Sequence, residues 1–326
     1  MLRHARARCA GGAVMVTGRS VKGWQVVLVA MLIGALAMTG CGGGPSADRS
    51  APASTPGTQG PAADPAYEVG NITATVSGRE VVGQCVGRKT DALTVLLEPG
   101  MGAPRGVFDV VEEHLVERTQ VCSYDRAGKG FSDRASTPRP VSEVVSDAHA
   151  FLAQAAKQGA PPPYFLVGHS FGGEVVFLYA QAHPDQVAGF VSINPSPPYK
   201  TWLRRARTVQ TEAEIREFEL PWARGDNEEG IDTRSDESML TDPLPADLPY
   251  AVMFDAYCGE LPPPLQNKQD CTRMVRLLEL TAKDLANVGK GGRYVRVKGA
   301  GHDIQDIKPE VVLATVDQVW TAAGGR

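Results

Sequence analysis

Residues 164–173 of the sequence read Tyr164-Phe165-Leu166-Val167-Gly168-His169-Ser170-Phe171-Gly172-Gly173. Two structural elements and the turn between them can be predicted from this segment. The four apolar residues at its start are typical of a buried strand, and the residues from 173 onward are typical of a helix. Between them stands a Gly-x-Ser-x-Gly pentapeptide, whose small residues let the backbone turn sharply. Ser170 is therefore predicted on a tight strand-to-helix turn, with its hydroxyl held out above the end of a sheet.

From residue 67 onward, short β-rich runs alternate with helical patterns on both sides of this turn. Such alternation indicates an α/β fold, a mostly parallel sheet flanked by helices. Strands are predicted at Leu93–Leu97, Gln120–Tyr124, Tyr164–Val167, Ala188–Ile193, Tyr250–Phe254 and Tyr294–Val297. Helices are predicted at Val107–Glu117, Val141–Lys157, Gly173–Ala182, Cys271–Leu285 and Glu310–Ala322. Between about 196 and 248 charged helical stretches interrupt the alternation, which predicts a helical cap over one end of the sheet.

Three further segments match the pattern of a known family. Residues 93–102 match a strand and an oxyanion loop, with Glu98-Pro99 where a His-Gly pair often begins. Residues 124–132 match an Asp-x-x-Gly-x-Gly-x-Ser turn, and residues 299–302 match a loop that presents a histidine. The chain from about residue 85 to 322 therefore resembles an α/β-hydrolase. The resemblance implies that fold, with a helical cap insertion and a serine nucleophile, and it implies neither a metal nor an organic cofactor.

The resemblance assigns the nucleophile and its general base. Ser170 occupies the nucleophile position, and the family's chain order places the histidine last. His302 is the one of the six histidines that lies beyond the cap, in a Gly-rich loop after a predicted strand. His302 is therefore predicted to take the proton from the Ser170 hydroxyl.

Four residues are considered for the third member of the triad. The family places an acid shortly after the strand that follows the cap, where Asp255 is the first carboxylate. Asp255 is therefore predicted as the acid, with Glu260 and Asp270 as alternatives. A second family variant places the acid after the strand before the cap, where this chain has Asn194. An amide there could orient the imidazole, but it could not stabilise the charged ring as a carboxylate does.

Two backbone N–H groups are predicted to form the oxyanion hole, those of Met101 and Phe171. The predicted reaction is hydrolysis of a small-molecule ester, as by a carboxylesterase or lipase, through an acyl-serine. In the cap, Trp202, Phe218 and Trp222 suit a hydrophobic acyl chain and equally suit packing of the cap onto the sheet. The fold also hosts peptidases, lactonases and perhydrolases, and a surface binding module without turnover is the alternative outside catalysis.

The N-terminal region is typical of an export signal. A basic stretch precedes an apolar run at residues 26–37 that is short for a membrane span, and small residues lead to Cys41. Residues 36–41 resemble a bacterial lipobox. Residues 1–40 are therefore predicted to be a lipoprotein signal peptide, and a lipid on Cys41 is predicted to anchor the protein outside the cytoplasm to the bacterial cell membrane. A start at Met15 would give a signal of normal length.

The rest of the chain divides into a tether and a domain. Residues 41–66 are mostly Gly, Pro, Ala and Ser, which predicts a flexible tether, and residues 67–326 form the predicted hydrolase domain. Residues 1–40 hold five basic residues and no acidic one, so the remainder has 28 basic and 37 acidic residues, a net charge of −9. This balance argues against nucleic acid as a partner.

Four cysteines lie within the predicted domain, Cys85, Cys122, Cys258 and Cys271. An even number in an exported protein favours disulfides over free thiols. Three pairings are open, and Cys85–Cys122 with Cys258–Cys271 is predicted because each pair is nearest in the chain. No close paired-cysteine spacing occurs, which argues against a metal site formed by the four.

Overall fold

The computed structural model describes residues 70–90, 92–235, 238–256, 258–261 and 267–325. The predicted signal peptide (1–40), the tether (41–66) and Cys41 lie outside the described residues. Within the described part of the chain, no helix is both long enough and apolar enough to cross a membrane.

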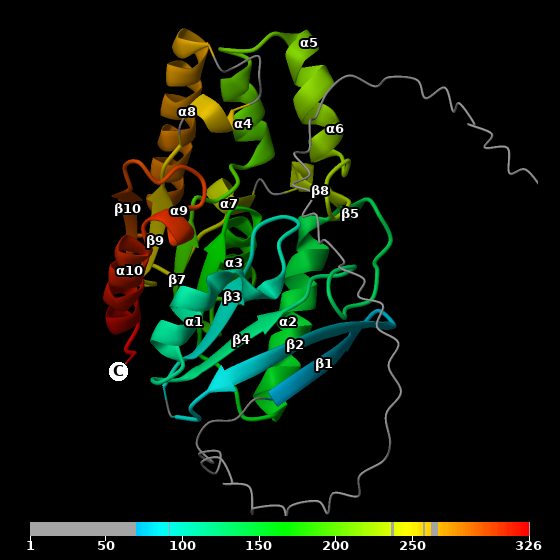
Figure 1. The fold of residues 1–326 in the computed structure, drawn as a ribbon, viewed down its shortest axis with the longest axis vertical. Coiled ribbons are helices and arrows are strands. Elements are labelled where there is room, and N and C mark those ends of the chain that lie inside the picture. The colour runs from blue at the N-terminus through cyan, green and yellow to red at the C-terminus, as the bar shows by residue number, and fades with distance from the viewer. Residues whose placement is uncertain (1–69, 91, 236–237, 257, 262–266, 326) are drawn as a thin grey trace, which may run out of the picture. The chain divides into compact units, whose positions relative to one another are not determined.

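An eight-stranded sheet forms the centre of the domain (Figure 1). In spatial order its strands are β1 (Gly70–Val76), β2 (Arg79–Gly87), β4 (Gln120–Tyr124), β3 (Thr94–Glu98), β6 (Tyr164–His169), β7 (Val187–Ile193), β9 (Tyr250–Phe254) and β10 (Gly292–Arg296). Strand β2 runs antiparallel to both neighbours, and the strands from β4 to β10 run parallel. The predicted mostly parallel sheet is confirmed, whereas the β1–β2 hairpin at its edge is an addition that the sequence patterns did not predict.

Helices cover both faces of the sheet. They are α1 (Asp109–Leu115), α2 (Val141–Lys157), α3 (Phe171–Ala182), α8 (Lys268–Ala286) and α10 (Pro309–Ala322). Along β3, Val95 and Leu97 pack into the hydrophobic cluster that includes residues of α1 and α10, while Leu96 packs into the cluster that includes residues of α2, α3 and α8. Because β3 is buried on both sides, its three central residues, Val95, Leu96 and Leu97, are all apolar rather than alternating with polar ones.

The segment between β7 and β9, residues 196–248, is called the cap segment below. It contains α4 (Tyr199–Ala206), α5 (Glu212–Glu214), the π-helical turn η2 (Ile215–Glu219), α6 (Leu220–Ala223), β8 (Ile231–Asp232), η3 (Thr233–Ser235) and α7 (Ser238–Thr241). Figure 1 shows α4, α5 and α6 beyond one end of the sheet. Strand β8 pairs with β5 (Arg139–Pro140), which joins the cap segment to the connection between β4 and α2.

The four cysteines form two disulfides, Cys85–Cys122 and Cys258–Cys271. Cys85 and Cys122 are directly opposite one another on the paired strands β2 and β4. The second disulfide joins the short turn η4 (Cys258–Glu260) to α8. It therefore restrains the loop that leaves β9, where two of the candidate acids lie.

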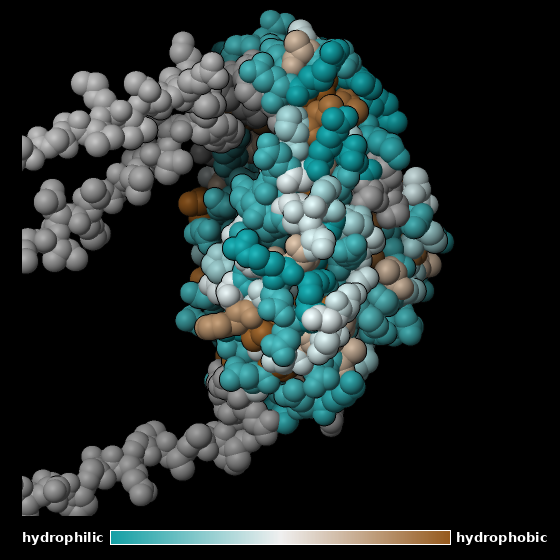
Figure 2. Space-filling view, turned by 90° about the vertical axis from the view of Figure 1, so that its right-hand side faces the viewer, coloured by the Kyte–Doolittle hydropathy of each residue, from teal (hydrophilic) through white to brown (hydrophobic). Residues whose placement is uncertain are grey.

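The face drawn in Figure 2 is mainly hydrophilic, with hydrophobic residues scattered over it. Among the described residues, the exposed large apolar side chains are Val110, Phe131, Trp222, Leu280 and Ile307. Such isolated apolar residues are normal on a protein surface and mark no interface by themselves. Trp222 differs in that it also lines a pocket beside the site described next.

Candidate active site

Ser170 lies on a sharp turn between β6 and α3, as predicted. Its backbone has φ 54° and ψ −120°, a conformation that a residue with a side chain rarely adopts. The turn also needs its glycines. A Cβ on Gly168 would lie 2.2 Å from the carbonyl oxygen of Gly172, and one on Gly172 would lie 2.0 Å from that of Glu98. The backbone is thus packed tightly enough to fix the position of the serine hydroxyl.

His302 meets Ser170 at the carboxyl ends of the parallel strands. Its Nε2 lies 2.9 Å from Ser170 Oγ, although the two residues are 132 positions apart. The loop that carries it follows β10 and contains Gly299 and Gly301, both with positive φ. These glycines let the backbone fold back so that the ring reaches across to the serine.

The side chain that contacts the other ring nitrogen of His302 belongs to Asn194. This residue directly follows β7 and has a φ of 48°. Its Nδ2 lies 3.3 Å from His302 Nδ1 and donates to the backbone carbonyl of Asp255 at 2.8 Å. An amide donor therefore faces Nδ1 in this arrangement, held in that orientation by a carbonyl acceptor.

Asp255 lies beside the histidine loop, but its carboxylate does not bind the imidazole. Oδ2 accepts hydrogen bonds from the N–H groups of Ala300 at 2.8 Å and Gly301 at 2.9 Å. Oδ1 forms an ion pair with Arg296 at 2.9 Å. Asp255 thus lies against the loop that carries His302. Both of its carboxylate oxygens already have partners, the backbone N–H groups of the loop and the side chain of Arg296.

The two alternative acids lie in different places. Glu260 Oε1 accepts a hydrogen bond from the backbone N–H of His302 at 2.6 Å. Asp270 lies in the first turn of α8, where Asn267 Nδ2 donates to its carboxylate at 2.7 Å. Of the three carboxylates considered, Glu260 is the one bound to His302 itself. The sequence indicated that Glu260 lies in the turn after β9. It did not indicate that this turn meets the loop that carries His302.

A second histidine lies beside the first. His169 Nε2 is 3.0 Å from the backbone oxygen of His302, and burial is the main cause that lowers the pKa of His169 to about 4. His169, His302 and Asp303 offer three atoms of metal-ligand type within 4.8 Å of one another. In the described structure the Nε2 atoms of both rings face hydrogen-bond partners, Ser170 Oγ and a backbone carbonyl, so the geometry suits proton transfer.

The predicted oxyanion donors are close to Ser170, one at the start of α3 and the other in the loop after β3. Phe171 is the first residue of α3, where backbone N–H groups have no partner within the helix. Met101 follows Gly100, whose added Cβ would lie 3.5 Å from the Cβ of Ser170. Among the contacts of the described residues, the N–H of Met101 has no acceptor. Both positions suit an anion that develops beside Ser170 Oγ.

Comparison with known proteins supports the fold. Residues 89–246 match the family described as "Serine aminopeptidase, S33". The enol-lactonase from Burkholderia xenovorans LB400 matches with a TM-score of 0.52 and 16% identity, over 76% of this chain and 99% of that one. A thermophilic esterase from Thermogutta terrifontis matches with a TM-score of 0.51 and 19% identity, over 78% and 99%. The protein has the α/β-hydrolase fold.

A curated relative of this chain is "Putative carbamate hydrolase RutD" from Azorhizobium caulinodans. The two are 33% identical over 116 residues, which is 36% of this chain and 42% of the relative. The chain therefore spans less than half of that relative's length.

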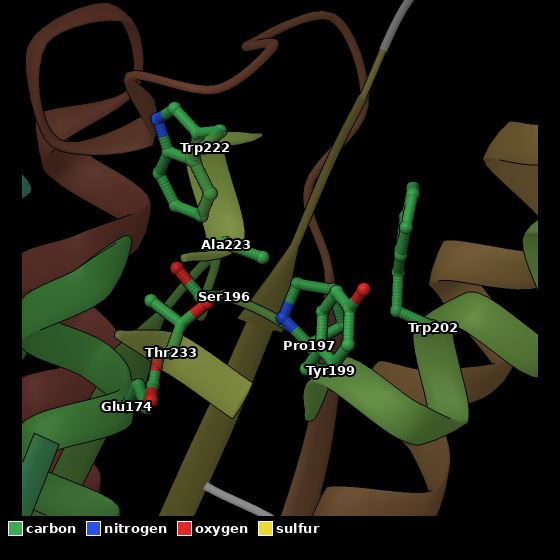
Figure 3. Close-up of a pocket in the computed structure, with 8 residues that line it drawn as sticks. All are labelled: Glu174, Ser196, Pro197, Tyr199, Trp202, Trp222, Ala223 and Thr233. Carbon is green, nitrogen blue, oxygen red and sulfur yellow. The ribbon is translucent and has the colours of Figure 1, made fainter. Parts of the chain in front are cut away.

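The candidate site opens into a cleft of about 590 Å³. Ser170, Asn194, Glu260 and His302 all line it. A smaller pocket of about 130 Å³ shares Ser196 and Pro197 with the cleft (Figure 3). It is lined by Glu174, Ser196, Pro197, Tyr199, Trp202, Trp222, Ala223 and Thr233.

The cap aromatic residues have separate positions around this pocket. Figure 3 shows the indoles of Trp202 and Trp222 on different sides of it. The side chain of Phe218 lies outside the described residues. The two tryptophans thus line a space beside the cleft that contains Ser170.

Proposed function

We propose that this α/β-hydrolase is a serine hydrolase that cleaves a carboxylic ester. His302 Nε2 takes the proton of the Ser170 hydroxyl while Oγ attacks the carbonyl carbon. The tetrahedral intermediate then collapses, the bond to the alkoxy oxygen breaks, and the imidazolium returns the proton to the leaving alcohol. Water repeats these steps on the acyl-serine and releases the acid. The 2.9 Å contact between His302 Nε2 and Ser170 Oγ carries this proposal.

The N–H groups of Met101 and Phe171 are the proposed donors to the tetrahedral oxyanion. Both are backbone groups, so an apolar side chain at either position does not weaken them. Two such donors lower the barrier because they are already aimed at the charge before it develops.

Glu260 is the proposed acid of the reaction, in place of the predicted Asp255. To accept a proton at Nε2, His302 must carry its hydrogen at Nδ1, and that hydrogen needs an acceptor. Glu260 already binds the N–H of His302, and the backbone nitrogen and Nδ1 of one histidine are only four bonds apart. A side-chain rotation of Glu260 supplies the acceptor, whereas Asp255 would first have to leave Arg296 and the loop.

The proposed substrate is an ester with a compact apolar group. The pocket beside the cleft is lined by the rings of two tryptophans, a tyrosine and a proline, together with Ala223 and the polar residues Glu174, Ser196 and Thr233. It is large enough for a short acyl or alkyl group. The names of similar proteins, an esterase, an enol-lactonase and a carbamate hydrolase, support hydrolysis at a carbonyl carbon.

The proposed location is outside the cytoplasm, with the domain anchored to the membrane through a lipid on Cys41. The apolar run at 26–37 and the small residues before Cys41 support this, as do two disulfides, which persist in oxidising compartments. Mass spectrometry of the N-terminal peptide, with and without globomycin, tests it. An unmodified Cys41 in membrane-associated protein would show the proposal wrong.

A fluorophosphonate label and a series of p-nitrophenyl esters of rising acyl length test the reaction. Ser170 should be labelled, and Ser170→Ala and His302→Ala should each lose nearly all activity while keeping the melting temperature. The double variant should be little worse than either single one, because the pair acts as a unit. Full activity in Ser170→Ala would refute the proposal. A folded protein that is neither labelled nor active would instead indicate a binding module.

A further inference from the structure

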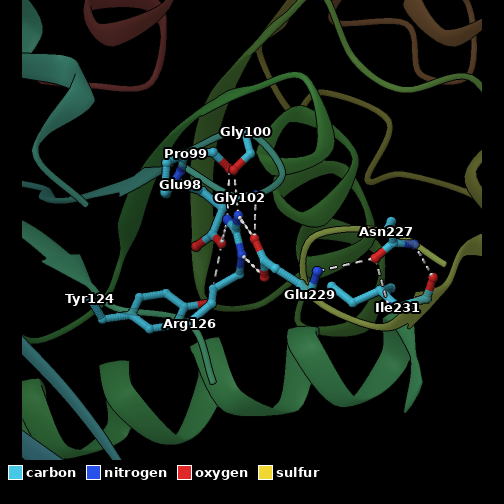
Figure 4. A network of polar contacts seen from close by, with 9 residues as sticks. All are labelled: Glu98, Pro99, Gly100, Gly102, Tyr124, Arg126, Asn227, Glu229 and Ile231. Carbon is cyan, nitrogen blue, oxygen red and sulfur yellow. Dashed lines mark hydrogen bonds and ion pairs between the residues drawn. The ribbon is translucent and has the colours of Figure 1, made fainter. Parts of the chain in front are cut away.

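A buried ion cluster holds the oxyanion loop, residues 99–102. Arg126 Nη1 donates to the carbonyl oxygen of Pro99 at 2.7 Å, and Nη2 donates to that of Gly100 at 2.5 Å. Glu229 Oε1 accepts the N–H of Gly102 at 2.6 Å. Figure 4 shows these contacts converging on the loop from one side. Two carbonyls and one amide of a four-residue loop are thus bound by two side chains.

The two side chains are themselves paired. Arg126 donates from Nε to Glu229 Oε2 at 2.8 Å and from Nη2 to Oε1 at 2.6 Å, the two-point contact typical of arginine and carboxylate. Arg126 Nη1 also pairs with Glu98 at 2.9 Å. The guanidinium is 1% exposed and both carboxylates are fully buried. Because buried charges are costly to leave unpaired, none of the three groups moves independently of the others.

This arrangement fixes the direction of the Met101 N–H. The carbonyl of Gly100 and the N–H of Met101 belong to one peptide unit, which is planar and trans, so they point in opposite directions. Arg126 binds that carbonyl on one side of the loop, and the N–H of Met101 therefore points to the other. A Cβ on Gly100 would lie 3.2 Å from His169 Nδ1 and 3.5 Å from Ser170 Cβ, so this peptide lies beside the nucleophile.

Glu229 is supplied by the cap segment, 103 residues after Arg126. Asn227 shapes the turn that carries it. Its Oδ1 accepts the N–H of Ile231 at 3.0 Å, and its Nδ2 donates to the carbonyl of Trp222 at 2.9 Å. The same turn thus joins a wall of the apolar pocket to the carboxylate that binds the oxyanion loop.

We propose that Arg126 and Glu229 are positioning residues that aim the Met101 N–H at the oxyanion, so that the oxyanion hole is complete only when the cap segment is seated. This inference rests on the proposed serine hydrolase function. The proposed role can be distinguished from a purely structural one. A purely structural ion cluster would affect the stability of the fold, but its loss would not selectively weaken binding of the transition state.

The test compares Glu229→Gln with wild type and with Asp226→Asn, which alters an exposed carboxylate on the same part of the cap segment. Glutamine keeps the size of the side chain but loses the charge that holds the guanidinium. We expect kcat for a p-nitrophenyl ester to fall about 10²-fold with KM changed less than about threefold, since the loss of an oxyanion donor costs about 10² to 10³ in kcat. Binding of a trifluoromethyl ketone, which Ser170 converts to a tetrahedral oxyanion, should weaken in parallel. Asp226→Asn should match wild type.

If Glu229→Gln does not fold, Arg126→Lys takes its place under the same criteria, because an ammonium cannot bind two carbonyls and a carboxylate pair in one plane. The inference is overturned if kcat stays within threefold of wild type, or if kcat falls while ketone binding does not change. Ser170→Ala is run in parallel. If wild type is inactive or Ser170→Ala is active, the proposed function has failed; if only the Glu229 effect is missing, the inference alone has failed.

Discussion

Replacing Asp255 by Asn separates two roles for this residue, a triad acid and a support of the histidine loop. In the structure the carboxylate accepts two backbone N–H groups of the loop and pairs with Arg296. An asparagine oxygen can keep the two N–H contacts, but its amide nitrogen then faces the guanidinium. The substitution therefore removes one charged hydrogen bond and puts a donor against a donor.

The size of the effect follows from that contact. A hydrogen bond between charged groups contributes about 1.5–3 kcal/mol, and Arg296 is 27% exposed, so we take about 2 kcal/mol. In a domain of this size that corresponds to a melting temperature about 4–8 °C lower. If all of this free energy is lost by displacing His302 from its catalytic position, the activation barrier rises by the same amount. Since about 1.4 kcal/mol corresponds to a factor of ten, kcat then falls at most about 30-fold.

The assay is steady-state hydrolysis of a p-nitrophenyl ester together with a thermal melt, on Asp255→Asn, Arg296→Gln and the double variant. Arg296→Gln breaks the same ion pair from the other side and should reproduce both changes, and the double variant should be less than additive. In serine proteases, replacing the triad aspartate by asparagine lowers kcat about 10⁴-fold and leaves the geometry intact. A loss of that size in Asp255→Asn, with an unchanged melting temperature, would refute the supporting role and make Asp255 the acid.

Four further outcomes are expected. Glu260→Gln should lower kcat at least about 10²-fold with little change in the melting temperature, and near-wild-type kinetics would remove it from the mechanism. Asn194→Asp should cost about 1–3 kcal/mol in urea denaturation, because it puts an acceptor against the carbonyl of Asp255; higher activity at full stability would contradict this. Burial raises the pKa of Glu98 from 4.5 to about 7, so its protonated form stabilises the fold below pH 4.5 and this contribution disappears as the pH rises through 7. The free energy of unfolding should therefore fall by on the order of 3 kcal/mol between about pH 4.5 and 8, and this fall should be absent in Glu98→Gln. Trp202→Ala should shift kcat/KM toward longer acyl esters by about tenfold, and an unchanged chain-length profile would exclude the pocket as the acyl site.

Much of the fold could be predicted because its signals are local. The turn at Ser170 is marked by adjacent glycines, and the six predicted strands are present with bounds within two residues of those observed. The β1–β2 hairpin was missed since it lies before the first recognised segment. The pairing of Cys85 with Cys122 follows from strands that are neighbours in the sheet.

The site was harder to predict where it depends on long-range contacts. His302 could be placed by chain order, but which carboxylate it meets depends on how the loops after β9 and β10 cross. Asp255 and Glu260 are five positions apart, and one binds the loop while the other binds the histidine. The segment at residues 124–132 was interpreted as a structural turn, and nothing local shows that Arg126 meets Glu229.

Glu229, the carboxylate that the cap segment contributes to the ion cluster, also limits how this protein can be re-engineered. A cap that only shielded the cleft could be exchanged for that of another protein of the same fold, with substrate preference as the sole change. Here any transplanted cap must return a carboxylate to the place of Glu229, or Arg126 is left with Glu98 as its one acidic partner among the described residues. A chimera of this protein should therefore keep residues 227–231 of its own cap segment. Alternatively, the foreign cap should be transferred together with the arginine that its own carboxylate binds.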